Sequence, residues 1–370
     1  MKRTDFSVDW LFAACAPDTE LLPWNAQFTP VDLPHDWQIR HADDLYRDGT
    51  LFYRKYFFVT DVPGTRRMLW FGGTYMDTTV FVNGTEVGQW KYGYTSFWFD
   101  ITDALHEGQN EVLVRCNLRH PNSRWYSGAG LYRNVELWEA PDLHLMPDGL
   151  YVAAKEGDNG AWTVAVTAEA GSVTAASTGR TLTLHLTDDN GSLLGTAAIP
   201  ADAWAALPSP DGWRTGKETT IYKASHTFTL QDPALWDLDA PSFYHITAEL
   251  TGADGVTDTL TTRFGCRTIE ATPDCGLLVN HKRVLIKGVC IHHDFGCLGS
   301  AFEYSAAKRQ LEILKSMGVN SIRTGHTPPA PQFMDLADEM GILMDVESFD
   351  CWRSGKNPYD YGRFFDEWQE

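Results

Sequence analysis

The stretches Met317-Gly318-Val319-Asn320-Ser321-Ile322-Arg323-Thr324 and Met340-Gly341-Ile342-Leu343-Met344-Asp345-Val346-Glu347 decide the fold of the C-terminal part of this chain. Each opens with a Met-Gly pair and continues as a short, mostly apolar run. The residues before each pair have helical spacing, which predicts helices over 305–317, capped by Ser305, and over 331–340. Glycine is the usual residue just past a helix end. With a further apolar strand at 284–289, this alternation predicts a (β/α) barrel or a doubly wound sheet.

Residues before 271 show another pattern, in which apolar and polar side chains alternate and turn sequences follow. Thr78–Val82 and Thr85–Val87 flank Asn83-Gly84, a pair suited to a two-residue hairpin turn. Similar runs precede turn sequences at 61–64, 188–191 and 252–255. We therefore predict a β-sandwich or jelly roll over residues 1–140 and an immunoglobulin-like β-sandwich over 141–270.

Composition disfavours several classes of function. The 370 residues are 43% hydrophobic and 21% charged, as in a well-packed chain of two or three domains. The net charge of -19 argues against nucleic-acid partners and against anionic membranes. No stretch approaches the roughly twenty apolar residues of a membrane span. The seven cysteines form no CxxC pair, and no adequate signal-peptide core follows Met1, so we expect a reduced, cytoplasmic protein.

Polar and mostly ionisable side chains follow all three expected parallel strands. They are His292-His293-Asp294 after the first strand, Arg323 and His326 at the second, and Glu347, Asp350 and Trp352 at the third. Barrels carry their active sites at these strand ends. His and Asp hydrogen-bond hydroxyls, Arg orients a carboxylate, and Trp covers the apolar face of a sugar ring. We therefore predict a site for a polyhydroxylated ligand.

Other interpretations of these groups have less support. A surface location explains one such histidine, but less readily three successive strand ends. A metal is not expected, because neither helically spaced ligands nor three converging histidines are evident. Glu347 and Asp350 share one loop, whereas retaining glycosidases place two carboxyls about 5–5.5 Å apart, typically from different strands. A nucleophilic serine is unsupported, since no G-x-S-x-G elbow occurs.

Residues 320–329, Asn-Ser-Ile-Arg-Thr-Gly-His-Thr-Pro-Pro, together with 338–343, resemble the first sequence signature of glycoside hydrolase family 2. Gly325 and Thr327 depart mildly from the usual residues. Further stretches resemble the family's other domains and the start of its barrel; they are 33–37, 53–57, 75–84, 122–135, 235–236, 243–244, 263–265 and 287–294. The resemblance covers almost the whole chain.

This resemblance implies a multidomain fold and an activity. The fold is a sugar-binding-type jelly-roll domain over 1–140, an immunoglobulin-like β-sandwich over 141–270, and the first strands and helices of a (β/α)8 TIM barrel, incomplete, over 271–370. The implied enzyme is an O-glycosyl hydrolase that cleaves terminal β-D-galactosides with retention, using two glutamates. The family's Asn-Glu motif does not follow Glu347, so no catalytic residue is assigned. Both glutamates are expected beyond Glu370, and the activity belongs to the full-length parent.

The resemblance also implies residue roles. His292 and His326 match ligands of substrate hydroxyls, Arg323 matches an arginine that steadies the nucleophile, and Asp350 matches a glycone-binding acid. Trp352 completes the predicted substrate-binding set. The loop 122–125 can reach the active site in relatives. Some members bind magnesium through Glu-x-His in the third loop, for which residues 349–352, Phe-Asp-Cys-Trp, are a poor match; neither a metal nor a cofactor is expected.

Alternatives stay open within and outside this family. A β-glucuronidase or β-mannosidase would share the signatures. The β domains alone would also suit a non-catalytic carbohydrate-binding protein, although such a protein has no use for barrel strands. The expected partner is a carbohydrate substrate, and self-association into a homo-oligomer is a further hypothesis.

Overall fold

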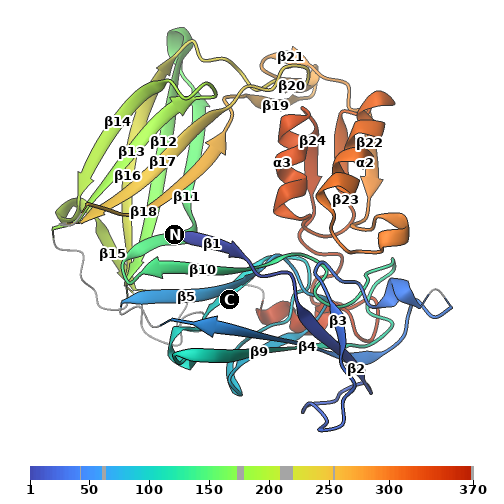
Figure 1. The fold of residues 1–370 in the computed structure, drawn as a ribbon. Coiled ribbons are helices and arrows are strands. Elements are labelled where there is room, and N and C mark those ends of the chain that lie inside the picture. Colours follow the sequence, from blue (N-terminus) through green and yellow to red (C-terminus); the bar gives the residue numbers. More distant parts are fainter. Residues whose placement is uncertain (42, 61–63, 173–178, 209–219, 253–254, 368–370) are drawn as a thin grey trace.

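The chain folds into two β-sandwiches and a smaller α/β part that packs against both (Figure 1). The computed structural model describes residues 1–41, 43–60, 64–172, 179–208, 220–252 and 255–367. The turns predicted at 61–64 and 252–255 include residues outside these ranges. Within them, no helix is long and apolar enough to cross a membrane. The short 3-10 helices are η1 (Gln38–Arg40), η2 (Thr102–Ala104), η3 (Asp158–Gly160), η4 (Ala201–Ala203), η5 (Gly296–Leu298) and η6 (Tyr361–Glu367).

The first sandwich consists of two antiparallel sheets. One sheet has the order β1 (Lys2–Asp5), β10 (Val135–Pro141), β5 (Thr65–Phe71), β8 (Phe97–Asp100). The other has the order β3 (Thr29–Val31), β2 (Trp10–Cys15), β4 (Gly49–Val59), β9 (Gly108–Leu118), β6 (Thr78–Val82), β7 (Thr85–Trp90). The predicted hairpin is confirmed: β6 and β7 meet across Asn83 and Gly84, whose φ angles are 50° and 80°. Those left-handed values are what a two-residue turn requires.

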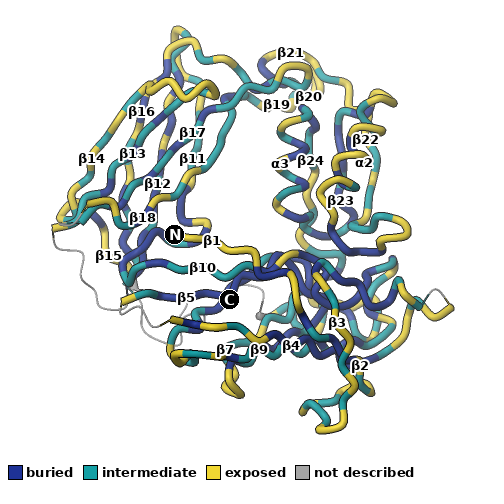
Figure 2. Tube along the Cα trace, in the orientation of Figure 1, coloured by how far each residue is buried: buried dark blue, intermediate teal, exposed yellow. Residues whose placement is uncertain are grey.

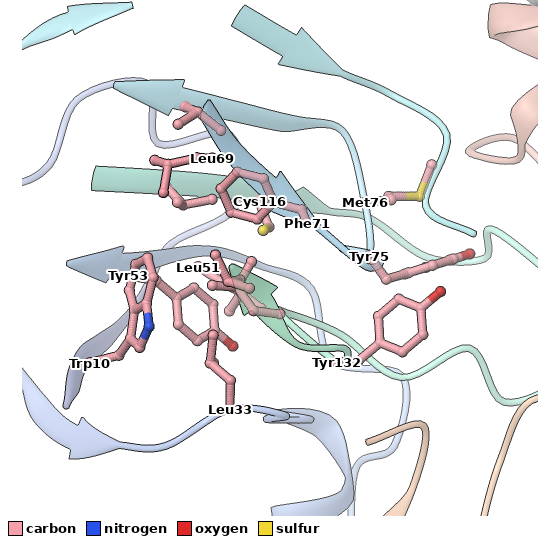
Figure 3. Close-up of a cluster of buried hydrophobic side chains, with 14 of the residues drawn as sticks. Trp10, Leu33, Leu51, Tyr53, Leu69, Phe71, Tyr75, Met76, Cys116 and Tyr132 are labelled. Atoms are coloured by element: carbon pink, nitrogen blue, oxygen red, sulfur yellow. The ribbon is translucent and has the colours of Figure 1, made fainter. Parts of the chain in front are cut away.

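Aromatic and aliphatic side chains fill the space between these two sheets. Figure 3 shows Trp10 and Tyr53 at one end of the cluster and Tyr75 and Tyr132 at the other. Every second residue of β9 from Val112 onward is buried, because successive side chains of a strand point to opposite faces. Figure 2 shows the result, with buried strand interiors between exposed turns.

The second sandwich is also antiparallel. One sheet has the order β11 (His144–Glu156), β12 (Ala161–Ser172), β16 (Thr220–Gln231), β15 (Ala205–Pro208). The other has the order β14 (Leu193–Pro200), β13 (Thr181–Asp188), β17 (Tyr244–Gly252), β18 (Gly255–Phe264). Its core is separate from that of the first sandwich and includes Trp162, Leu184 and Ile246. Strong alternation along β13 and β17 therefore corresponds to one buried face, as the sequence predicts.

A three-stranded meander leads into the α/β part. It consists of β19 (Ile269–Thr272), β20 (Gly276–Val279) and β21 (Lys282–Arg283). Then follow β22 (Gly288–Ile291), α2 (Tyr304–Ser316), β23 (Ser321–Thr324), α3 (Pro331–Glu339) and β24 (Leu343–Val346). The three strands β22 to β24 pair in parallel, so their C-terminal ends lie at one edge of the sheet. The predicted strand–helix alternation is confirmed.

The first of these strands lies further along the chain than predicted. The apolar run 284–289 is not a buried strand, because β22 begins at Gly288 and the side chains of Leu285 and Ile286 are 71% and 54% exposed. Asn320 explains the difference. Its Nδ2 donates to the carbonyl of Leu285 at 3.0 Å, and its Oδ1 accepts from the amide of Lys287 at 2.8 Å. The Asn320 side chain thus hydrogen-bonds two main-chain groups that the sequence pattern predicts to pair with a neighbouring strand.

The ends of the two helices differ in how well the sequence predicted them. Ser305 is not a cap, because α2 begins at Tyr304 and Glu303 occupies the N-cap position with extended backbone. The glycines that end the helices are confirmed, since Gly318 and Gly341 have φ angles of 86° and 65°. An L side chain is disfavoured in that region, whereas glycine enters it freely.

Candidate active site

The ends of β22, β23 and β24 bring polar side chains from three separate loops together. His292 follows β22, Arg323 lies within β23, and His326 follows β23 after a sharp turn. Glu347 and Asp350 follow β24. Because all three strands run in parallel, these side chains share one edge of the sheet.

Glu347 is the centre of a tight charged group. Its carboxylate forms an ion pair with Arg323, and its Oε2 lies 2.6 Å from His326 Nδ1. Arg323 Nη2 lies 3.2 Å from the same nitrogen. This arrangement fixes the His326 ring and directs its Nε2 to the side where Asp350 Oδ1 lies 4.0 Å away.

An aromatic side chain from the first sandwich covers the two histidines. Trp125 stacks on His292 with ring centroids 5.3 Å apart and planes at 6°. The same indole meets His326 edge-on at 5.5 Å, and the two imidazoles are 6.2 Å apart. His292 Nδ1 also contacts the carbonyl of Gly325. The stacked Trp125 and this main-chain contact together hold the His292 ring in place.

Two cations hold the carboxylate of Asp350. Arg124, from the first sandwich, contacts both oxygens, with Nε 3.3 Å from Oδ2 and Nη2 close to Oδ1. Lys356 Nζ donates to Oδ1 at 2.8 Å. Burial alone would raise the pKa of Asp350, but hydrogen bonds from Arg124 and Lys356 hold that pKa below its ordinary value. A carboxylate already bound to two cations does not fit a magnesium ion.

His293 points away from this group and toward the first sandwich. Its Nε2 lies 2.9 Å from the carbonyl of Ser127, and burial lowers its pKa to about 4. It lines a pocket open to solvent, together with Arg133, Phe302 and Phe333. A neutral, half-buried histidine of this kind serves packing between domains better than it serves ligand binding.

The structure brings together four of the five residues predicted to bind substrate, namely His292, Arg323, His326 and Asp350. Trp352 lies apart from them. Its ring packs edge-on against Phe349 at 5.3 Å and Phe365 at 5.6 Å, and it is 57% exposed. The binding role of all five stays a prediction.

Sequence reasoning left three contributors out of the predicted set. Glu347 was noted at a strand end but set aside with the catalytic pair. Arg124 and Trp125 lie more than 160 residues from the barrel strands that they meet, and only the resemblance of the loop 122–125 pointed to them. A second hollow, of about 280 Å³, lies where this loop meets the loop after β24, and its lining includes Trp125 and Asp350.

Comparison with known proteins gives matches along nearly the whole chain. Models of glycosyl hydrolases family 2 match residues 23–141 (sugar binding domain), 148–267 (the family's central domain) and 271–359 (TIM barrel domain). A β-galactosidase of Bacteroides ovatus, BoGH2A, is 35% identical over 100% of this chain and 44% of its own length. A β-glucuronidase of Bacteroides fragilis is 27% identical over 88% of this chain and 48% of its own.

A solved structure of a glycosyl hydrolase family 2 member from Bacteroides cellulosilyticus superposes with a TM-score of 0.85 at 29% identity. That alignment covers 99% of this chain and 48% of the other. The chain thus spans about half the length of the proteins that it matches. The jelly roll, the immunoglobulin-like sandwich and the parallel βαβαβ unit follow one another as the three matched models do, and the chain belongs to glycosyl hydrolase family 2.

Proposed function

We propose that the full-length protein is a retaining β-glycosidase that hydrolyses terminal β-D-galactosides. The observation that carries this proposal is the convergence of His292, His326 and Asp350 at one edge of the parallel sheet. Imidazole nitrogens and a carboxylate are suited to bind several hydroxyls of one sugar. Trp125, stacked behind the histidines, fixes their orientation. The relatedness to a β-galactosidase supports the choice of sugar.

The residues present would bind and orient the sugar, while the bond-breaking carboxylates come from elsewhere. Retention requires two carboxyls about 5–5.5 Å apart on either side of the scissile bond. Glu347 is engaged by Arg323 and His326, and Asp350 by Arg124 and Lys356. We therefore place the acid/base and the nucleophile outside residues 1–370, in the part of the relatives that this chain does not span.

A β-glucuronidase is the second candidate, since several relatives have that name. A uronate carboxylate would need a cation that is free to bind it. Arg323 already pairs with Glu347, and Arg124 and Lys356 pair with Asp350. The charges around the site are thus better matched to a neutral sugar, which favours the galactoside.

The test is a comparison of aryl β-D-galactoside, β-D-glucuronide and β-D-mannoside as substrates of the full-length protein. We expect the galactoside to have the highest kcat/KM. His326→Ala removes one hydrogen-bonding group and should lower kcat/KM by about 1–3 kcal/mol of transition-state binding, or about 5- to 150-fold. His185→Ala, at a partly exposed position of the second sandwich, is the control and should leave the rate unchanged. Preference for the glucuronide, or no loss in His326→Ala, would contradict the proposal.

Three further proposals concern the context of the site. We place the protein in the cytoplasm, and the support is that all seven cysteines are free and that Cys275, Cys290 and Cys297 are exposed, as reducing conditions permit. We propose domain boundaries at 140/141 and 270/271. A homo-oligomer is proposed as well, and sedimentation of the full-length protein would test it.

A further inference from the structure

We propose that Arg124 is a positioning residue for Asp350, through which the first sandwich sets the sugar preference of the strand-end site. This inference rests on the proposed function, in which Asp350 binds the sugar. Arg124 does not touch the reacting atoms; it acts through the carboxylate that it holds. Sugar selectivity would then depend on a contact between two domains.

The first step is the number of hydrogen bonds that Asp350 can still accept. A carboxylate offers about four lone-pair sites. Arg124 contacts both oxygens, and Lys356 Nζ takes a further position on Oδ1 at 2.8 Å. About one site is left for a ligand, and it lies on Oδ2, which accepts only from Arg124 Nε. A single accepting direction, on a carboxylate whose other oxygen lies 4.0 Å from His326 Nε2, discriminates between sugar epimers better than a freely rotating carboxylate.

The second step is the rigidity of the loop that presents Arg124. Asn122 is 2% exposed, donates to the carbonyl of Arg119 at 2.8 Å and accepts from Tyr75 at 3.1 Å. Ser123 Oγ donates to the carbonyl of Trp125 at 2.7 Å. The main chain on both sides of Arg124 is therefore fixed, although its own side chain is 51% exposed. A fixed fork of two donors sets the plane of the carboxylate, which a single ammonium cannot do.

The third step is that the loop after β24 is held to the first sandwich without Arg124. The amide of Tyr359 donates to the carbonyl of Pro121 at 3.2 Å. The amide of Gly93 donates to Tyr361 Oη at 2.9 Å, and Tyr92 packs its ring on Phe349 at 5.2 Å. Loss of Arg124 should therefore leave the segment docked as a whole, while the Asp350 carboxylate loses its fixed orientation and the main chain next to it opens more often (Figure 1 shows this segment returning to the first sandwich).

The kinetic experiment uses the full-length protein with Arg124→Ala, Arg124→Lys and the control Arg353→Ala. Arg353 pairs with Asp366 in the same segment, and both side chains are at least 78% exposed. For the aryl β-D-galactoside, kcat/KM of Arg124→Ala should fall about 10- to 100-fold, mostly through a higher KM. The reason is that Asp350, which Arg124 orients, binds the substrate before the reaction. The variant's preference for galactoside over glucoside should drop at least about fivefold. Arg124→Lys should recover little, since one ammonium does not replace the fork.

Two readouts separate positioning from mere stability. Added guanidinium ion at low millimolar concentration should restore activity to Arg124→Ala several-fold and should do nothing for Arg353→Ala. Hydrogen exchange of the peptide 348–357 should quicken in Arg124→Ala alone, and this measurement needs no substrate. Unchanged exchange together with an unchanged galactoside-to-glucoside ratio would overturn the inference. If the wild type does not act on galactosides while the exchange effect persists, the proposed function fails and the positioning of Asp350 stands.

Discussion

Gly341 and Gly318 provide a matched pair for testing how the α/β part packs on the second sandwich. Both end a helix after methionine and both have left-handed φ angles, 65° and 86°. A Cβ at Gly341 would lie 2.1 Å from the carbonyl oxygen of Leu238, whereas a Cβ at Gly318 would meet nothing within 4 Å. The first position is therefore a close approach of two main chains, and the second is only a left-handed helix end.

The two alanine variants should differ sharply in stability. Gly318→Ala incurs only the left-handed penalty, about 1–2 kcal/mol. Gly341→Ala adds a clash with main-chain atoms, which must move by more than 1 Å, so we expect a total loss of about 3–5 kcal/mol. The shift would also disturb Lys315, which donates to the carbonyl of Leu238 at 2.8 Å. Its ammonium ties α2 to the same loop of the second sandwich.

Hydrogen exchange of the peptides around Trp236 and Asp338, measured in increasing urea, tests this difference. Trp236 is 1% exposed, and its indole donates to the carbonyl of Asp338 at 2.9 Å, so exchange of these two segments reports on the interface. A chain of several domains need not unfold in two states, so the transition of these peptides is compared between variants rather than converted to a global value. Equal losses in Gly341→Ala and Gly318→Ala, within about 0.5 kcal/mol, would refute the close-packing argument.

The stability of the fold should also depend on pH, through two effects of opposite sign. Burial lowers the pKa of His35 and of His293 to about 4 from 6.5. Protonation therefore favours the unfolded chain, and stability that is fully present above pH 6.5 is lost as the pH falls toward 4. The loss is up to about 3 kcal/mol per residue. Urea unfolding at pH 7 and pH 4.5 checks this, and His293→Gln should reduce the difference. His281 lies 2.7 Å from Glu156 and 3.0 Å from Glu270, and the hydrogen bond to Glu156 raises its pKa. Its contribution is therefore present at low pH and lost as the pH rises through that pKa, which an NMR titration and His281→Gln would show.

The parts of the fold that the sequence predicts well are those where one local pattern determines the outcome. Alternation along 181–188 and 244–252 can bury only one face, and Asn83-Gly84 can form few turns other than the one observed. The Met-Gly pairs at 317–318 and 340–341 end helices because glycine enters the left-handed region at the lowest cost. These predictions needed no knowledge of tertiary contacts.

The parts that were missed depend on residues far away in the sequence. The run 284–289 is apolar enough for a strand, but the Asn320 side chain bonds the Leu285 carbonyl and the Lys287 amide, and the strand begins only at Gly288. The ends of the parallel strands could be predicted from the sequence, and so could the positions of His292 and His326 at those ends. The stacking of Trp125 on His292, and the hold of Arg124 on Asp350, arise only when two domains dock. No periodicity within either domain encodes that docking.

The same docking explains residues that sequence comparison alone would assign to a sugar-binding domain. The buried carboxylate of Asp36 accepts hydrogen bonds from the amides of Gln38 and Ala129, from Tyr126, and from both the amide and hydroxyl of Ser300. Three segments of the joint between the first sandwich and the α/β part, 36–38, 126–129 and the one with Ser300, thus meet at one side chain. A carboxylate satisfied by five donors has little capacity left for a sugar.

Arg133, which lines the same pocket as His293, has a complementary role. Its guanidinium donates to the carbonyls of Gly72 at 3.0 Å and Tyr94 at 2.8 Å within the first sandwich, and to the carbonyl of Pro328 at 3.3 Å in the loop after β23. That loop carries His326, so a cation buried in one domain fixes the main chain beside a candidate ligand of the other. The first sandwich therefore contributes to the candidate site chiefly as a frame, which holds the loops after β22, β23 and β24 in register.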